Sequence, residues 1–65
     1  MRIQVNGAWR ETAVAQLAAA LTELGYGDSI VTTALNGEFV PVGERAATPL
    51  AEGDQLEVLA PMQGG

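Results

Sequence analysis

Hydrophobic and polar residues alternate near both ends of the chain. Ile3 and Val5 are each flanked by polar residues, and Leu56 and Val58 alternate with Gln55 and Glu57 near the end. A period of two is typical of a β-strand that buries one face. The pattern therefore predicts an initial strand and a final strand over residues 55–61.

Two Asn-Gly dipeptides predict two β-hairpins. Both residues of such a pair accept positive φ angles, which a type I′ turn requires. Asn6-Gly7 would join the initial strand to a returning strand over Ala8–Glu11. Asn36-Gly37 would join a well-buried strand over Ile30–Leu35 to a short one over Glu38–Val40, where Pro41 ends the pairing.

The segment between the two hairpins has helical periodicity. Apolar residues spaced three and four apart form one stripe, which consists of Val14, Leu17, Leu21 and Leu24. Thr12 is a suitable N-cap and Gly25 a suitable left-handed C-terminal residue. We therefore expect a helix over Ala13–Leu24, with its apolar stripe in the core.

The remaining segments complete a fold prediction. Residues 42–50 are irregular, with one helical turn expected around Glu44–Ala47, and Glu52-Gly53-Asp54 is a tight turn. The order is strand, strand, helix, strand, strand, strand, and the one helix has to cover one face of the sheet. The prediction is a single α+β domain over residues 1–65, a roll with one mixed sheet of about five strands covered by one helix.

Composition excludes several classes of protein. The 65 residues include no Cys and no His, so neither a disulfide nor a His- or thiolate-bound metal is available. The formal net charge of −5 and only three basic residues argue against nucleic-acid binding, which needs a basic surface. No stretch reaches the roughly 18 apolar residues of a membrane helix, and the N-terminus lacks the apolar run of a signal peptide. We expect a soluble cytoplasmic protein that does not bind a membrane.

The side chains offer no catalytic constellation, because an enzyme needs a nucleophile, acid or base held in place by its neighbours. His, Cys and Lys are absent, and the carboxylates fall at turns and on strand surfaces. The C-terminal Gly64-Gly65 is more informative, since chance would place two glycines there in roughly half a percent of chains. Without Cβ atoms such a tail fits a narrow slot. The Gly65 carboxylate is then a candidate reactive group, and a loose end without function is the alternative.

The chain resembles a known family in its order of elements and in its short motifs. The order of elements is similar to the ubiquitin-like β-grasp fold, and the particular residues resemble the ThiS family of sulfur carrier proteins. The resemblance covers nearly the whole chain and is strongest in its combination of short motifs: Asn6-Gly7, Leu35-Asn36-Gly37-Glu38, Val40-Pro41, Thr48, Leu50, Glu52-Gly53-Asp54 and the closing Pro61-Met62-Gln63-Gly64-Gly65.

The resemblance implies a function for the C-terminus. A ThiF-like adenylating enzyme, similar to ubiquitin-activating enzymes, would use ATP and Mg²⁺ to form an acyl-adenylate at Gly65. A persulfide sulfur would displace AMP and leave a thiocarboxylate, and a ThiG-like thiazole synthase would use that sulfur to build the thiazole of thiamine. The chain itself would bind no cofactor or metal and would be a co-substrate rather than an enzyme. Gly64, which has no side chain, would keep the tail narrow and its backbone conformation unrestricted.

A partner-binding face is also expected beside the tail. Leu59 is out of phase with the two apolar residues before it, so it is expected to point away from the helix together with Pro61. Phe39 is a further candidate, although a core position is equally compatible with its phase. Met62 and Gln63 would complete the neck of the tail. An exposed apolar patch of this kind marks an interaction site, and the unbranched Met side chain adapts to more than one partner.

Two alternatives remain open. One is a sister sulfur carrier, resembling the small subunit of molybdopterin synthase or a cysteine-forming carrier. The other is a β-grasp interaction module that needs no free carboxylate. The chain also departs from the family pattern, which commonly has Arg after the Val-Pro pair and an aromatic residue or His three positions later. Val42 and Arg45 stand at these positions, and the segment between the second strand and the helix looks shortened.

Overall fold

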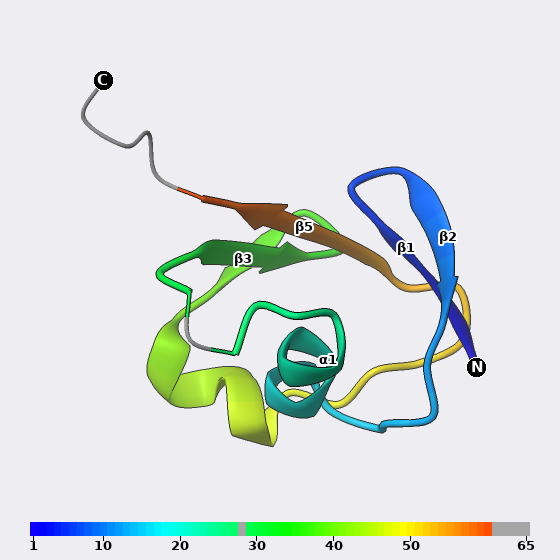
Figure 1. The fold of residues 1–65 in the computed structure, drawn as a ribbon, viewed down its shortest axis with the longest axis horizontal. Coiled ribbons are helices and arrows are strands. Elements are labelled where there is room, and N and C mark those ends of the chain that lie inside the picture. Colours follow the sequence, from blue (N-terminus) through cyan, green and yellow to red (C-terminus); the bar gives the residue numbers. More distant parts are fainter. Residues whose placement is uncertain (28, 61–65) are drawn as a thin grey trace.

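The computed structural model describes residues 1–27 and 29–60. Its elements follow the predicted order, and the helical turn expected before the last strand is a short 3₁₀ helix (Figure 1). They are β1 (Arg2–Val5), β2 (Ala8–Glu11), the helix α1 (Leu17–Glu23), β3 (Thr32–Leu35), β4 (Glu38–Val40), the 3₁₀ helix η1 (Val42–Ala47) and β5 (Gln55–Leu59).

The five strands form one mixed sheet in the order β2-β1-β5-β3-β4. The last strand is the central one: it runs parallel to β1 and antiparallel to β3. The other two pairings are the antiparallel hairpins β1-β2 and β3-β4. Both helices lie on the same side of the sheet (Figure 1). The predicted fold class, a β-grasp roll with one main helix, is confirmed.

The core lies between α1 and the sheet. Its side chains come from the helical stripe and from alternate strand positions, as the periodicity predicts. The buried apolar residues are Ile3, Val5, Leu17, Ala20, Leu21, Val31, Val40, Leu50, Leu56 and Val58. Val14 and Leu24, at the ends of the predicted stripe, are partly buried against this cluster. Each fully buried aliphatic side chain contributes about 1.5–3 kcal/mol, so these few residues carry most of the hydrophobic stabilisation.

Both predicted hairpin turns have the expected backbone. The φ angles are 52° and 86° at Asn6 and Gly7, and 52° and 85° at Asn36 and Gly37. Positive φ at both central residues is the type I′ pattern, whose twist matches that of the flanking strands. The left-handed conformation predicted for Gly25 after the helix is also present, with φ at 95°.

The prediction for the helix start was wrong. The helix begins at Leu17 rather than Ala13, and its N-cap is Gln16, whose side-chain oxygen accepts a hydrogen bond from the Ala19 amide. The preceding segment is instead held by backbone bonds to a distant part of the chain: Leu50 N–H donates to Ala15 O, and Leu17 N–H donates to Thr48 O. Tertiary pairing thus replaces the first helical turn.

Thr12 has a different role from the predicted helix cap. It is buried, its hydroxyl accepts a hydrogen bond from Val14 N–H at 3.2 Å, and it donates to the Glu23 carboxylate near the end of α1. Thr12 therefore ties the connection after β2 to the last turn of the helix.

Two further boundaries differ from prediction. The third strand begins at Thr32, and Ile30 is 84% exposed rather than part of a buried strand. In the described residues the pairing with β5 starts at Thr32, and Ile30 lies before it, outside the ladder. The helical turn predicted around Glu44–Ala47 is longer and starts at Val42.

Candidate functional site

The candidate site lies at the end of β5, the strand that leads to the C-terminal tail. Because β5 is central, it pairs with β1 at its first two residues and with β3 from Leu56 to Leu59, and its direction is set by both neighbours. Ala60 is the last residue before the tail that the structure describes. The five predicted site residues of the tail and its neck lie outside the described residues: Pro61, Met62, Gln63, Gly64 and Gly65.

The predicted phase of β5 is confirmed. Leu56 and Val58 are buried against the helix side, and Leu59 is 66% exposed. Leu59 therefore lies on the outer face of the sheet, opposite the helix, because successive strand residues point to opposite faces.

Phe39 also lies on the outer face, which resolves its ambiguous phase. In the sheet register Ala34 stands opposite Phe39 on one side and opposite Glu57 on the other, so all three share a face. Phe39 is 66% exposed. The structure thus places Phe39 and Leu59 on one surface, with β3 between their strands; we call these two residues the outer apolar pair.

Asn6 holds the end of β5 through its side chain. The ladder between β1 and β5 includes Val5 and Leu56 and goes no further, because β1 turns away at Asn6-Gly7. Beyond that point the Asn6 amide takes the place of a strand: its Oδ1 accepts from Val58 N–H at 2.8 Å, and its Nδ2 donates to Val58 O at 3.1 Å. Both backbone groups of Val58 are thereby satisfied.

Asn36 holds the beginning of the same strand. Its Oδ1 accepts from Gln55 N–H at 2.9 Å, and its Nδ2 donates to the Asp54 carboxylate at 3.1 Å. Its own N–H donates to Gln55 O at 2.7 Å. The sequence identified both asparagines as turn residues, but not that their side chains fasten the central strand. The one local hint is that both turns use Asn, whose amide can donate and accept at once.

Arg45 occupies a position where the family pattern differs, and it has a structural role here. Its Nη2 donates to Val31 O at 2.6 Å, and its Nε donates to the hydroxyl of the fully buried Thr33 at 3.1 Å. That hydroxyl donates in turn to Val40 O at 2.9 Å. Arg45 therefore supplies hydrogen bonds at the beginning of β3, whereas Val42, the other departure, is an exposed residue of η1.

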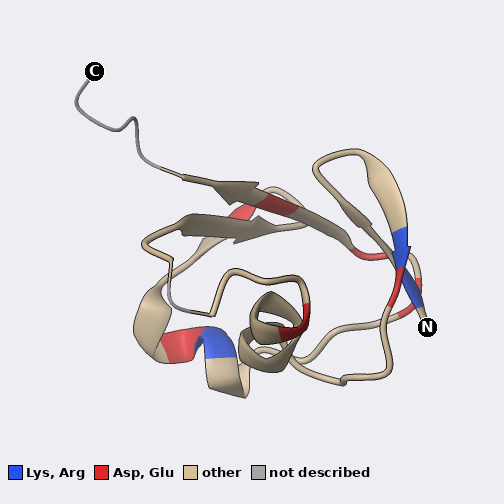
Figure 2. Cartoon of the chain, viewed as in Figure 1, with Lys and Arg blue, Asp and Glu red and all other residues tan. Residues whose placement is uncertain are grey.

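Charged residues are distributed unevenly (Figure 2). Arg2 stacks over the Trp9 ring at 4.7 Å from its centroid, on the β1-β2 hairpin. Within the described ranges 1–27 and 29–60, no three acidic side chains are grouped so that they could hold a metal ion. No helix in that part of the chain is long and apolar enough to cross a membrane.

Comparison with known proteins gives a consistent result. The ThiS family profile matches residues 3–65. The crystal structure of a thiamine biosynthesis protein (ThiS) from Geobacter metallireducens is similar over 100% of both chains, with a TM-score of 0.83 and 32% sequence identity. A solution structure of a thiamine biosynthesis protein from that organism has a TM-score of 0.79 and 32% identity, over 100% of this chain and 88% of the other. A search of curated proteins finds no match.

The family profile extends over both hairpins, the helix and the Gly-Gly tail, and the solved structure reproduces the fold along the whole chain. The resemblance inferred from the short sequence motifs is therefore confirmed. The chain belongs to the ThiS family, the small sulfur carrier proteins of thiamine biosynthesis, which are not enzymes.

Proposed function

We propose that the Gly65 carboxylate carries the sulfur. An adenylating partner enzyme activates it: a carboxylate oxygen attacks the α-phosphorus of ATP and pyrophosphate leaves. The terminal sulfur of a persulfide then attacks the acyl carbon and displaces AMP. A thiol cleaves the resulting S–S bond and leaves a thiocarboxylate, from which a thiazole synthase takes sulfur. ATP and Mg²⁺ belong to the adenylating enzyme, and the need for ATP favours the cytoplasm.

The observation that carries this proposal is the family match, which reaches through Gly64-Gly65. Two features of the chain agree with it. The sequence contains no Cys, so sulfur has no side-chain thiol to occupy. The tail follows directly on the central strand, whose far end is fastened by Asn6.

The proposal is tested by mass spectrometry after incubation of the protein with its adenylating enzyme, ATP and a sulfur donor. We expect one oxygen-to-sulfur exchange, located on the C-terminal peptide, and none in a variant with two residues appended after Gly65. Sulfur on an internal residue, or sulfur transfer by the extended variant, contradicts the proposal. The thiocarboxylate product is then offered to thiazole synthase. Transfer of its sulfur to the thiazole is the result expected of a thiamine carrier, and no transfer is the result expected of a sister carrier.

Gly64→Ala tests whether the tail must be slim. A methyl group there meets the partner's channel, so adenylation is expected to fall by at least about tenfold, a factor that corresponds to about 1.4 kcal/mol. The melting temperature is expected to stay within the error of the wild type. If the melting temperature falls in step with adenylation, the tail has a structural role instead.

Leu59→Asp tests the outer apolar pair as a partner surface. Both members are large, exposed apolar side chains beside the exit of the tail, and such patches mark interaction sites. The substitution is expected to leave the circular dichroism spectrum unchanged and to weaken binding to both partner enzymes by about 2 kcal/mol, as for an interface hot spot. Thr32→Asp, opposite Leu59 in the register, is a control for added charge alone. Equal losses in the two variants would assign the effect to charge rather than to the leucine.

A further inference from the structure

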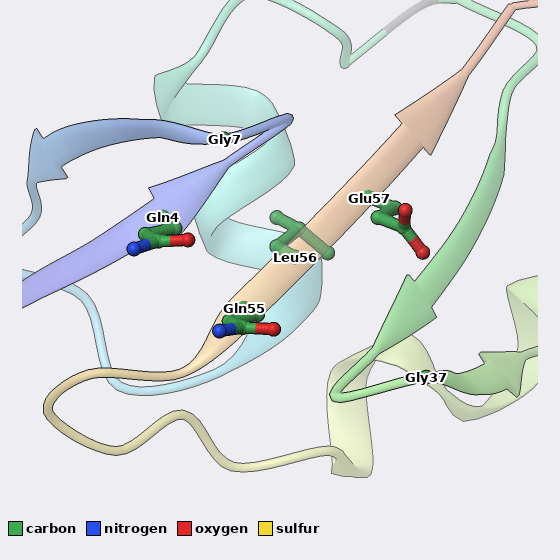
Figure 3. Close-up of a pocket in the computed structure, with 6 residues that line it drawn as sticks. All are labelled: Gln4, Gly7, Gly37, Gln55, Leu56 and Glu57. Carbon is green, nitrogen blue, oxygen red and sulfur yellow. The ribbon is translucent and has the colours of Figure 1, made fainter.

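The outer face of the sheet has a groove over β5, between the two Asn-Gly turns (Figure 3). Its volume is about 270 Å³. Three polar side chains line it, Gln4 from β1 and Gln55 and Glu57 from β5, and Gly7 and Gly37 form its two ends. The side chain of Leu56 is buried on the helix side, so this residue contributes backbone to the floor.

The two glycines that line the groove have open space beside them. A Cβ atom built at Gly7 or at Gly37 has no atom within 4 Å, so the space beside each turn is free. The asparagines of the same turns use their amides on backbone groups of β5 and on the Asp54 carboxylate. The groove is therefore a hollow of the folded surface that no side chain of the two turns fills.

Glu57 is the one charged residue among those that line the groove, and Arg2 and Arg45 make their contacts with other residues. Arg2 lies on the outer face, two positions before Gln4, and stacks there on Trp9, which stands opposite Gln4. Arg45 donates to Thr33 and to the Val31 carbonyl. Arg10 stands opposite Ile3, which is buried on the helix side, so Arg10 shares that side of the sheet. The groove thus presents the Glu57 carboxylate and the amides of Gln4 and Gln55, while the stacking of Arg2 and the hydrogen bonds of Arg45 are made with other residues.

This set of acceptors fits a guanidinium group. Arginine has five N–H donors in a planar fork, which a carboxylate binds through two bonds while neighbouring amide oxygens accept others. The groove is also continuous with the outer apolar pair, since Glu57 shares a face with Phe39 and Leu59. Apolar anchors beside an arginine are a common composition for the energetic centre of a protein interface.

We propose that the groove receives an arginine side chain of the adenylating enzyme, placed over Glu57 while the outer apolar pair is covered by the same partner. This inference rests on the proposed function, because it deepens the account of how that enzyme is recognised. Glu57 would bind the adenylating enzyme and fix the position of the chain on it, and would take no part in the chemistry at the tail.

The test measures binding of the adenylating enzyme by calorimetry, with Glu57→Gln, Glu57→Asp and the matched control Glu44→Gln. Glu44 is an exposed acidic residue of η1 on the other side of the sheet, so its substitution removes the same charge outside the groove. We expect Glu57→Gln to raise Kd about tenfold at low salt, as for loss of one partner of a hydrogen-bonded charge pair. Glu57→Asp keeps the charge and is expected to recover part of the affinity.

Salt dependence provides a second readout. Between about 50 and about 200 mM NaCl the wild-type Kd is expected to rise, and the rise is expected to be smaller for Glu57→Gln because the screened pair is gone. The proposal is overturned if Glu57→Gln and Glu44→Gln bind equally well with the wild-type salt dependence. Failure of the proposed function is a different result, in which the wild-type protein itself is not adenylated.

Discussion

The two Asn-Gly turns have the same sequence and nearly the same φ angles, but their surroundings differ. Asn6 bonds to both backbone groups of Val58, near the end of β5, in a partly buried setting. Asn36 bonds to Gln55 and Asp54, where β5 begins, in an exposed setting. Two copies of the same dipeptide thus fasten the two ends of the central strand. The hydrogen bonds of Asn6 are partly buried, and those of Asn36 are exposed to water.

The difference shows that the surroundings of an Asn-Gly turn decide what its asparagine side chain does. As turns the two dipeptides are equivalent, since each reverses the chain by the same backbone geometry. The hydrogen bonds of the two asparagine side chains are not equivalent. An unpaired backbone group costs more free energy where water cannot replace the lost bond. The end of β5 that leads to the tail therefore depends on Asn6 more than its beginning depends on Asn36.

The largest expected effect tests what the turns share. Gly7→Val and Gly37→Val each place a β-branched residue at positive φ, and each should lower the free energy of unfolding by about 2–3 kcal/mol. Gly43→Val is the control, because its Cβ also has open space but its φ lies outside the left-handed region. Urea denaturation of the three variants measures the comparison. A loss at Gly43 as large as at the turns would assign the cost to the side chain and not to the backbone.

The next effect separates the turns. Asn6→Gly keeps the backbone geometry and removes only the amide, so Val58 loses both partners. We expect a loss of about 2 kcal/mol in the free energy of unfolding, together with faster hydrogen exchange at the Val58 amide. Asn6→Asp keeps an acceptor for Val58 N–H and should lie between the wild type and Asn6→Gly. Unchanged exchange at Val58 would contradict the role of this side chain.

The smallest effect is expected for Asn36→Gly. The backbone bond from residue 36 to Gln55 O remains, and water can replace the lost acceptor at the exposed Gln55 N–H. We expect a loss of about 0.5–1 kcal/mol in the free energy of unfolding, by urea denaturation. If Asn36→Gly is as destabilising as Asn6→Gly, the two turns are equivalent in energy and partial burial at Val58 does not distinguish them.

Much of the fold was predictable because its signals are local. The alternation around Ile3 and Val58 reports a strand with one buried face, and the Asn-Gly pairs report type I′ turns through the φ angles of two residues. The exposure of Leu59 followed from counting along one strand. Phe39 could not be placed in the same way, because its face depends on the register between β3 and β4.

The errors in prediction arose where distant segments compete with local preference. Thr12 and the alanines after it favour a helix, but Ala15 and Leu17 make backbone bonds with Leu50 and Thr48 instead. Ile30 has the composition of a buried strand residue, but it lies before the first β3 residue that pairs with β5 and is exposed.

By itself the sequence determined the order of elements, the faces of the first and last strands, the backbone of both turns and the family of sulfur carriers to which the chain belongs. Only the tertiary structure decided that β5 is central, that Asn6 and Asn36 hold its two ends, and that Gln4, Gln55 and Glu57 line one groove. The physical reason is separation along the chain. Asn6 and Val58 are 52 positions apart, and a hydrogen bond between them has no local signal because it exists only after β1 and β5 have paired.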